Sequence, residues 1–347
     1  MRDSSDLYHS GRVAEWAAVL QRDGYLLLRG VLPPQKILAA RSCVCEALRD
    51  DWDRIDTESQ LAQADAVAAA AGSPTEQLFS ATPLLRARIK LEPASAASSS
   101  SSSASVPARL QPGVLMTGYR PVTHDPRVLD VLEGPELSRM FAQLFGHIRA
   151  EERATSAAVT PAATPLVAPA TFDTKWVRVH SRSELTDEHT DYYRFEHFDA
   201  VTTGKEDGAK DMFTCWIPLG FTPISHGTLA VAESTHKLRG YSKGVFDPTS
   251  SSSSSEEGKS REELPPDFRR WLNGTLPDSP GPAVWRTTAF APGDLVVFDI
   301  RLVHASTRND HDCFRMSMDT RWKPNDQVGP DQRESFNDMS AHLPNRM

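Results

Sequence analysis

The second half of the chain consists mainly of short segments with the composition of β-strands. From residue 172 onward, segments rich in β-branched and aromatic residues are separated by Gly, Pro, Asn or Asp; they cover 172–179, 188–195, 211–219, 227–234, 283–290, 294–306 and 313–322. A parallel α/β sheet would need helices between these strands, and the intervening sequence shows no helical pattern. The pattern therefore predicts an all-β sandwich or jelly roll over residues 171–323.

The first 150 residues are predicted to be mainly helical. Apolar residues recur at helical spacing over 11–23, a short apolar segment bounded by glycines follows at 24–30, and Pro33 and Pro34 open a second helix that extends to about Arg49. Further helices are expected over 56–71 and over 124–146, the latter as two short helices broken at Gly134-Pro135. We expect one domain over 1–347, mainly β with N-terminal helices.

Three low-complexity segments interrupt this pattern. They cover about 94–108, 154–170 and 249–262, and they are rich in Ser, Ala, Pro or Glu. Such compositions bury too little apolar surface to order themselves. Because the flanking segments belong together, we interpret all three as loop insertions within the single domain.

Composition and charge exclude several classes of protein. The net charge is -8 and the 38 Lys and Arg residues are scattered, which argues against a nucleic-acid partner. The sequence contains no apolar run long enough for a membrane span and no N-terminal secretory pattern, so we expect a cytoplasmic protein. The cysteines are expected to be buried reduced thiols; they are Cys43, Cys45, Cys215 and Cys313. Nothing in the sequence indicates the oligomeric state.

Two histidines and one aspartate have the spacing of a non-haem iron site. His189 and Asp191 lie two apart on a predicted strand, so both side chains point to the same face. His304 lies near the end of a strongly apolar segment and can supply the third ligand. Two His and one carboxylate on one face of Fe(II) leave positions open for a co-substrate and O2. These three residues are the candidate metal ligands and catalytic residues.

The His-x-Asp pattern by itself has low specificity. A second copy occurs at His197 and Asp199, but it leads into a polar, glycine-containing loop that would not hold ligands rigidly. The pair at 189 and 191 is, on its own, equally typical of an exposed strand with ordinary polar residues.

An arginine follows His304 at a suitable interval. Arg315 lies eleven residues later, with a turn sequence at 309–312 between them, so two adjacent antiparallel strands are expected to present both side chains to one cavity. A guanidinium can bind the distal carboxylate of 2-oxoglutarate with two parallel hydrogen bonds. Ser306 and Ser317 could add a hydroxyl. Arg321 is the rival, and we expect it to have a surface or salt-bridge role instead.

Several other conspicuous residues are expected to be structural. His236 is interpreted as a residue that closes a strand and Asp294 as a turn former, whereas His180 is expected in a loop.

Several segments in one order resemble a known family. DGYLLLRGVL, HTDYY, TCWIPLG, GTLAVAESTHK, APGDLVVFD and VHAST with FRMSMDTRW are similar to segments of the phytanoyl-CoA dioxygenase family. The resemblance runs from about residue 14 to 323, apart from the Ser-rich insertions. It implies a double-stranded β-helix (jelly-roll, cupin-like) core and a dioxygenase that uses Fe(II), 2-oxoglutarate and O2.

The resemblance also assigns roles to individual residues. It implies that His189, Asp191 and His304 bind iron and that Arg315 binds 2-oxoglutarate. Trp216 matches a position beside the co-substrate, Ser306 matches one that can bond the distal carboxylate, and the resemblance implies that Lys175 or Trp176 lines the same pocket.

The expected reaction is hydroxylation of a C–H bond, with release of succinate and CO2. The segments 206–214 and 233–283 depart from the family pattern, so the substrate is expected only to be a small molecule or lipid-derived. Two alternatives remain open: a non-catalytic jelly-roll binding protein, and a cupin-like metal enzyme that uses no 2-oxoglutarate.

Overall fold

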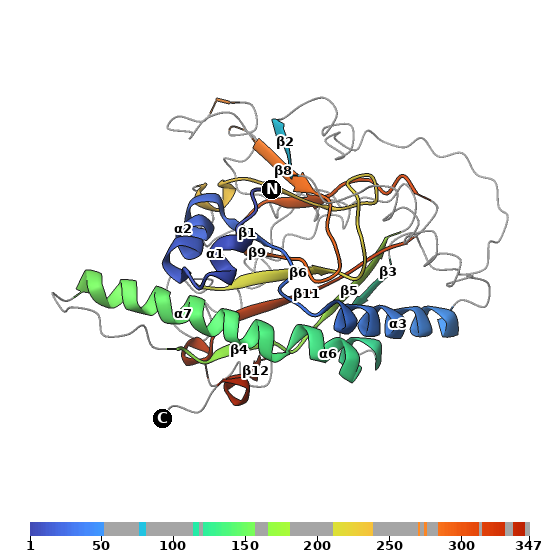
Figure 1. The fold of residues 1–347 in the computed structure, drawn as a ribbon, viewed down its shortest axis with the longest axis horizontal. Coiled ribbons are helices and arrows are strands. Elements are labelled where there is room, and N and C mark those ends of the chain that lie inside the picture. The colour runs from blue at the N-terminus through green and yellow to red at the C-terminus, as the bar shows by residue number, and fades with distance from the viewer. Residues whose placement is uncertain are drawn as a thin grey trace, which may run out of the picture.

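A computed structural model describes most of the sequence (Figure 1). The described residues are 1–51, 76–80, 114–117, 121–156, 166–180, 211–238, 270, 274–275, 284–311, 314–329 and 336–343. His189, Asp191, Cys313, the predicted helix at 56–71 and the insertions at about 94–108 and 249–262 lie outside them.

The larger of two sheets contains eight strands in the described residues. Its main path runs β1-β9-β6-β11-β4-β12, and β5 joins β11 to β3. The strands are β1 (Tyr25–Leu28), β3 (Val114–Thr117), β4 (Pro169–Phe172), β5 (Trp176–His180), β6 (Phe213–Pro218), β9 (Leu295–Asp299), β11 (Arg315–Pro324) and β12 (Phe336–Asp338). Every pairing between two of these named strands is antiparallel, which confirms the mainly β architecture, and one isolated bridge, from Asp3 to Leu27, is parallel.

The long strand β11 organises this sheet. One edge of β11 pairs with β6, with Asp319 opposite Trp216. The other edge is divided: the first half pairs with β5, where Arg315 lies opposite His180, and the last residues pair with β4. The predicted strand at 172–179 is therefore two strands, with a short connection between Phe172 and Trp176.

The smaller sheet has the order β10-β7-β8-β2. Its strands are β2 (Glu76–Ser80), β7 (Leu229–Ala232), β8 (Val284–Thr288) and β10 (His304–Ser306). The predicted single strand at 294–306 is wrong, because its two ends belong to different sheets. Asp299 ends β9 by accepting hydrogen bonds from the backbone N–H groups of Arg301 and Leu302, and the chain then crosses to β10.

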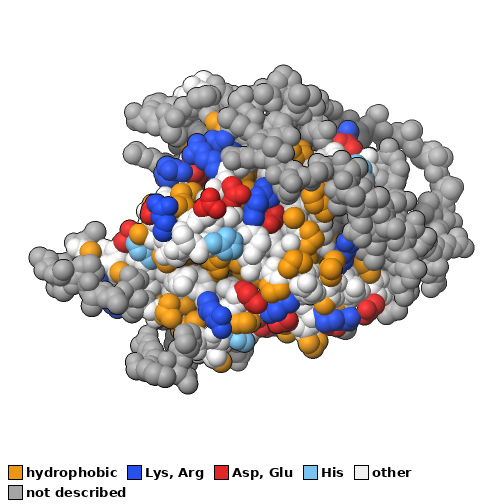
Figure 2. Space-filling view, viewed as in Figure 1, with side chains coloured by type: hydrophobic (Ala, Val, Ile, Leu, Met, Phe, Trp, Pro, Cys, Tyr) orange, Lys and Arg blue, Asp and Glu red, His pale blue; other side chains and the backbone are white. Residues whose placement is uncertain are grey.

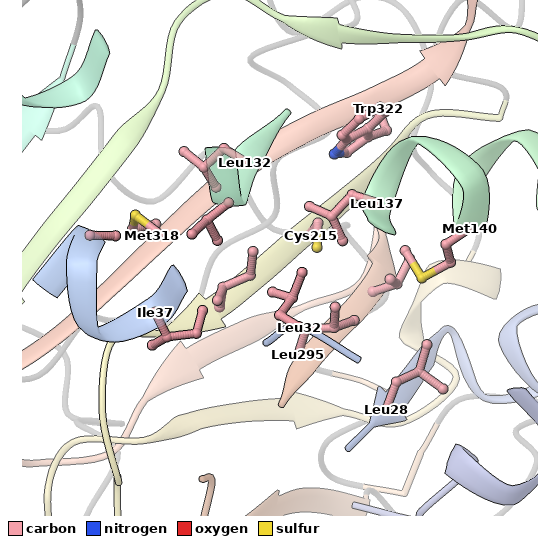
Figure 3. Close-up of a cluster of buried hydrophobic side chains, with 14 of the residues drawn as sticks. Leu28, Leu32, Ile37, Leu132, Leu137, Met140, Cys215, Leu295, Met318 and Trp322 are labelled. Carbon is pink, nitrogen blue, oxygen red and sulfur yellow. The ribbon is translucent and has the colours of Figure 1, made fainter. Parts of the chain in front are cut away.

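The two faces of the larger sheet have different environments. Side chains alternate along a strand, so Met316, Met318 and Trp322 of β11 point to one face and Arg315 and its odd-numbered neighbours to the other. Figure 3 shows the first face, where Ile37, Leu132, Leu137 and Met140 from helices pack on Cys215, Leu295, Met318 and Trp322. Trp322 also stacks on Phe141, with ring centroids 4.7 Å apart.

The second face of the larger sheet packs on the smaller sheet. Tyr25, Trp216 and Phe298 from the larger sheet form one buried cluster with Leu229 and Val231 of β7. The molecule thus has three layers, with helices on one side, the larger sheet in the middle and the smaller sheet on the other side (Figure 1).

The helices cover the sheet face away from the smaller sheet. They are α1 (Ser5–His9), α2 (Val13–Asp23), α3 (Pro34–Asp51), α6 (Pro126–Leu132) and α7 (Pro135–Ser156), with short 3-10 turns at Pro121–His124, Thr235–Lys237, Asn325–Gln327 and Ser340–His342. The predicted helices at 11–23 and 33–49 and the strand at 24–30 are confirmed. The break at Gly134-Pro135 is also present, but the helix after it is long and not short, and it enters the segment predicted as a loop from 154.

Two features concern the predicted partners: the distribution of charged side chains on the surface, and the length and apolar character of the helices. On the face shown in Figure 2, basic and acidic side chains of the described residues are interspersed. None of the helices in the described part of the chain combines the length and apolar character that a bilayer crossing demands. Cys43, Cys45 and Cys215 are buried and form no disulfide, as predicted.

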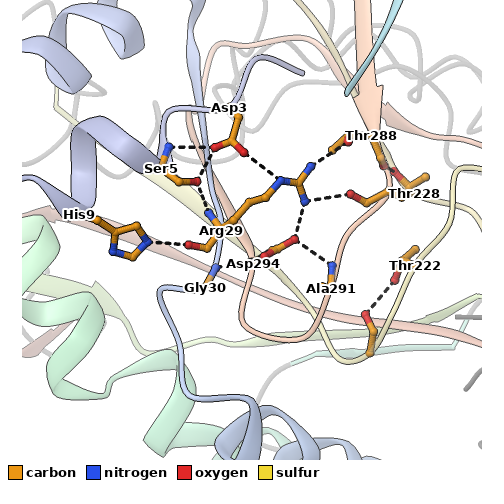
Figure 4. A network of polar contacts seen from close by, with 12 residues as sticks. Asp3, Ser5, His9, Arg29, Gly30, Thr222, Thr228, Thr288, Ala291 and Asp294 are labelled. Atoms are coloured by element: carbon orange, nitrogen blue, oxygen red, sulfur yellow. Dashed lines mark hydrogen bonds and ion pairs between the residues drawn. The ribbon is translucent and has the colours of Figure 1, made fainter. Parts of the chain in front are cut away.

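A polar network ties the N-terminal segment to the β8–β9 turn (Figure 4). Arg29 donates to Asp294 at 2.7 Å, to Thr288 at 3.0 Å and to Asp3 at 3.1 Å. Asp294 also accepts from the backbone N–H groups of Ala291 and Gly30. Burial raises the pKa of Asp294, and Arg29 and the backbone donors oppose that rise. Asp294 is therefore a structural turn residue, as the sequence predicts.

Gly24 joins α2 to β1 at a position that only glycine fits. Its φ is +85°, and a Cβ there would lie 2.4 Å from Nδ1 of His236 and 2.6 Å from Cδ1 of Leu302. The left-handed conformation and the close contacts both oppose a larger residue.

We predict that Gly24→Ala lowers the free energy of unfolding by about 2–5 kcal/mol, because backbone strain and overpacking add. The control is Gly11→Ala, where φ is +70° but a Cβ meets nothing within 4 Å, so strain alone costs about 1–2 kcal/mol. Urea unfolding measures both values. Equal losses in the two variants would contradict the packing role of Gly24.

Candidate functional site

A pocket lies between the two sheets and encloses about 390 Å³ of space, measured out to its open side. It is lined by Arg178 of β5, Thr214 and Trp216 of β6, Leu229 of β7, Phe298 of β9, His304, Ala305 and Ser306 of β10, and Arg315, Asp319 and Arg321 of β11. The odd residues of β11 reach it because they share the face opposite the helix-covered core. The structure thus brings the sequence candidates His304, Ser306, Arg315 and Trp216 to one cavity.

His304 is held in one tautomer at the pocket wall. Its Nδ1 lies 2.9 Å from the carbonyl oxygen of Leu302, which can only accept, so Nδ1 carries a proton; in the neutral ring, Nε2 then carries the lone pair. The ring packs on Phe298, with centroids 4.7 Å apart, and the residue is 6% exposed. A backbone acceptor on one ring nitrogen is the usual arrangement for a histidine that binds a metal through the other.

Arg315 is buried with its guanidinium plane fixed by three partners. Nε donates to the carbonyl oxygen of Gly227 at 2.8 Å, one terminal nitrogen donates to Oγ of Ser317, and the other donates to Nδ1 of His180 at 2.9 Å. The three acceptors lie on different segments, namely the turn before β7, β11 itself and β5. A guanidinium held so rigidly at a pocket wall is suited to bind a carboxylate through two parallel hydrogen bonds.

His180 is a site residue that the sequence prediction placed in a loop, which is wrong. It ends β5, directly opposite Arg315 in the sheet, and its backbone carbonyl accepts from Asn309 at 3.2 Å. Burial and the nearby charges of Arg315 and Arg178 hold the pKa of His180 well below 6.5. The neutral ring can therefore accept the hydrogen bond from Arg315. The sequence does contain a signal for this position. Trp176, Arg178 and His180 lie two residues apart, as side chains on one face of a strand do, and this spacing could have assigned His180 to the strand.

A second charged group lies on the same pocket wall. Asp319 accepts from Nε of Arg178 at 2.7 Å and forms a short ion pair with Arg321. Arg321 also lies over the ring of Trp176, with 4.2 Å from its guanidinium carbon to the ring centroid. The predicted salt-bridge role of Arg321 is confirmed, but its predicted surface position is wrong. Arg321 is 1% exposed because it shares the inward face of β11 with Arg315.

His304 and Arg315 do not lie on adjacent strands, so that prediction is wrong. β10 pairs with β7 in the smaller sheet, whereas β11 lies in the larger sheet between β5 and β6. The two residues reach the same pocket because their sheets face each other. Between β10 and β11 the chain therefore passes from the smaller sheet to the larger one.

Lys175 lies outside the pocket lining. Its ammonium forms an ion pair with Glu133 at 2.7 Å and donates to the carbonyl oxygen of Phe172. Burial lowers the pKa of Lys175, and Glu133 opposes that shift. Lys175 is one residue before β5, so its side chain points to the helix side while Trp176 and Arg178 point to the other.

The remaining candidate ligands, His189 and Asp191, fall outside the described residues. Within the part of the chain that the structure describes, no three His, Cys, Asp or Glu side chains gather closely enough to hold a metal ion. His304 is therefore the one predicted ligand whose surroundings are known.

Comparison with known proteins gives no family assignment. No family model matches the chain and no curated protein matches it, so membership of the phytanoyl-CoA dioxygenase family is not shown.

Several solved structures are similar in backbone arrangement. The epimerase SnoN, in complex with Fe3+, alpha ketoglutarate and nogalamycin RO, has a TM-score of 0.47 at 15% identity, over 91% of this chain and 84% of that chain. EctD from S. alaskensis, with 2-oxoglutarate and 5-hydroxyectoine, has 0.47 at 14% identity, over 91% and 77%. HygX from Streptomyces hygroscopicus, with nickel and 2-oxoglutarate bound, has 0.38 at 12% identity, over 92% and 93%. At these TM-scores and identities the likenesses carry no conclusion about the activity of this chain.

We predict that His180 makes the fold less stable in acid. Its folded pKa is depressed, so below about pH 6.5 the unfolded chain binds a proton that the folded chain does not. The free energy of unfolding should fall with acidification by up to about 1.4 kcal/mol per pH unit from this group. In His180→Asn, whose side-chain oxygen can still accept from Arg315, this contribution should vanish. Urea unfolding between pH 7.5 and 5 measures it, and parallel pH profiles for the two proteins would contradict the assignment.

Proposed function

We propose that the chain is an Fe(II)- and 2-oxoglutarate-dependent dioxygenase that hydroxylates a C–H bond of a small-molecule or lipid-derived substrate and releases succinate and CO2. The observation that supports this most is the convergence of His304 and Arg315, from opposite sheets, on one pocket. A metal-binding imidazole and a carboxylate-binding guanidinium are the two groups that a chelating keto-diacid requires.

We further propose that residues 171–323 form a double-stranded β-helix within a single domain, similar to that of the phytanoyl-CoA dioxygenase family. Two antiparallel sheets that face each other across a pocket support this.

In this proposal, His189, Asp191 and His304 hold the iron. The donor set suits Fe(II), and the protonated Nδ1 of His304 directs the lone pair of Nε2 to a ligand. The bound iron, together with 2-oxoglutarate and O2, would supply the oxidising power for the hydroxylation.

Several other residues at or beside the pocket position the co-substrate in this proposal. Arg315 binds its distal carboxylate, with Ser306 as a further hydroxyl donor and Trp216 beside it. The neutral ring of His180 keeps the guanidinium of Arg315 in its plane. Leu229, Phe298 and Trp216 form an apolar wall that excludes water and strengthens these charge interactions.

We predict that Arg315→Gln raises the KM for 2-oxoglutarate about 10- to 100-fold, because one charge-assisted interaction is lost. Succinate formation with Fe(II) and O2 measures this effect. The matched control is Arg286→Gln, since Arg286 is equally buried and ion-paired with Glu233 but lies outside the pocket lining. An unchanged 2-oxoglutarate requirement in Arg315→Gln would favour a metal enzyme that does not use this co-substrate.

We predict that His304→Ala and Asp191→Ala each weaken Fe(II) binding at least tenfold and abolish succinate formation, because each removes one of three protein ligands. Equilibrium dialysis measures the metal and an assay for succinate measures turnover. His236→Ala is the control, because His236 is also buried but bonds to the backbone of Gln21. Full iron binding without His304 would refute the metal site, whereas iron binding without succinate formation by the unmodified chain would favour a non-catalytic binding protein.

A further inference from the structure

The backbone before His304 is held by a side chain that the proposed iron and co-substrate sites do not include. Thr235 lies in the short turn after β7, is fully buried, and brings its hydroxyl to the segment that enters β10. Its Oγ1 accepts a hydrogen bond from the backbone N–H of Val303 at 2.9 Å and donates one to the carbonyl oxygen of Ala232 at 2.8 Å. The hydroxyl thus joins the end of β7 to the residue before His304.

The N–H group of Val303 belongs to the same peptide unit as the carbonyl group of Leu302. That carbonyl oxygen is the acceptor for Nδ1 of His304, at 2.9 Å. Because a trans peptide unit is planar and its N–H and C=O groups point in opposite directions, a bond on the N–H fixes the direction of the C=O. The bond to Thr235 also polarises the peptide unit, which strengthens the acceptor on its other side. Thr235 therefore acts on the ring of His304 through one rigid peptide unit.

Helix α2 holds the turn that carries Thr235. The three other residues of this turn donate hydrogen bonds to the last carbonyl oxygens of the helix, at 2.9 to 3.0 Å. These pairs are Ser234 with Asp23, His236 with Gln21, and Lys237 with Arg22. From the other side, the N–H group of Ala232 donates to the carbonyl oxygen of Val303 at 2.9 Å. The orientation of His304 is therefore fixed before any ligand binds.

We propose that Thr235 is a positioning residue for His304. Its hydroxyl fixes the peptide unit that keeps a proton on Nδ1 of the neutral ring and the lone pair on Nε2. Without that fixed acceptor, either ring nitrogen can carry the proton, and the other tautomer offers a donor at Nε2 in place of a lone pair. That the lone pair serves an iron ion rests on the proposed function; the control of the tautomer does not.

The first test follows the ring of His304 in the whole chain without a metal. In mildly alkaline buffer, nitrogen NMR of isotope-labelled histidines distinguishes the two tautomers, and His304→Ala assigns the signals. We expect only the Nδ1–H tautomer in the unmodified chain and a mixture of both tautomers in Thr235→Val, which keeps the shape of the side chain but not its acceptor. Thr235→Ser keeps the hydroxyl and should restore the single tautomer. A single Nδ1–H tautomer in Thr235→Val would overturn the proposal.

The matched control is Thr320→Val. Thr320 is also fully buried, its hydroxyl lies 2.9 Å from that of Thr171, and it lies outside the pocket lining. This variant should lose stability but keep the single tautomer of His304. A mixture in Thr320→Val as well would mean that general loosening of the fold causes the effect, and the proposal would fail. If Thr235→Val does not fold, Thr235→Cys replaces it, because a thiol is a weak acceptor and should also give the mixture.

A second measurement separates this proposal from the proposed function. In anaerobic equilibrium dialysis with Fe(II) alone, Thr235→Val should weaken the Kd about tenfold, because the groups that orient a metal ligand contribute roughly that much to affinity. Thr235→Ser and Thr320→Val should stay within about threefold of the unmodified chain. Equal Kd values for Thr235→Val and Thr320→Val would contradict the positioning role. If the unmodified chain binds no Fe(II), the proposed metal site fails, whereas the NMR comparison still decides whether Thr235 controls the tautomer of His304.

Discussion

The alternation of side chains along β11 is the constraint on which the rest of the structure depends. Its even residues, Met316, Met318 and Trp322, pack against the helices, and its odd residues, Arg315, Asp319 and Arg321, line the pocket. A slip of one residue in the pairing with β6 would place the charges in the apolar core. The core that stabilises the sheet therefore also fixes the position of the charged groups.

Burying so many charges on one face requires that each be held by a partner. An unpaired guanidinium in such a place would cost several kcal/mol, and the protein avoids this in two ways. Asp319 serves Arg178 and Arg321, while Arg315 is bonded by neutral acceptors on His180, Ser317 and the backbone. None of these three acceptors carries a negative charge. The low pKa of His180 is a consequence of the same arrangement.

Sequence reasoning succeeded where local periodicity decides structure. The helix at Val13–Asp23, the strand at Tyr25–Leu28 and the long strand from Arg315 follow from spacing, from bounding glycines and prolines, and from β-branched composition. Sequence reasoning failed where the structure of a segment depends on which strand it pairs with. Residues 294–306 look like one apolar strand, but the chain turns at Asp299 and enters the other sheet. The sequence suggested that Arg321 lies at the surface near a strand end. In the structure its side chain is on the inward face of β11 and lines the pocket.

The sequence by itself determined that the chain has helices before a β region. It also identified His304, Ser306, Arg315 and Trp216 as candidate site residues. It could not determine which strands pair, because pairing depends on contacts between residues far apart in the chain. Tertiary structure alone placed His304 and Arg315 on facing sheets, set Lys175 against Glu133 on the opposite side, and brought His180 to Arg315. The physical reason is that a strand presents either face equally well in isolation, and only packing of the layers decides which side chains meet.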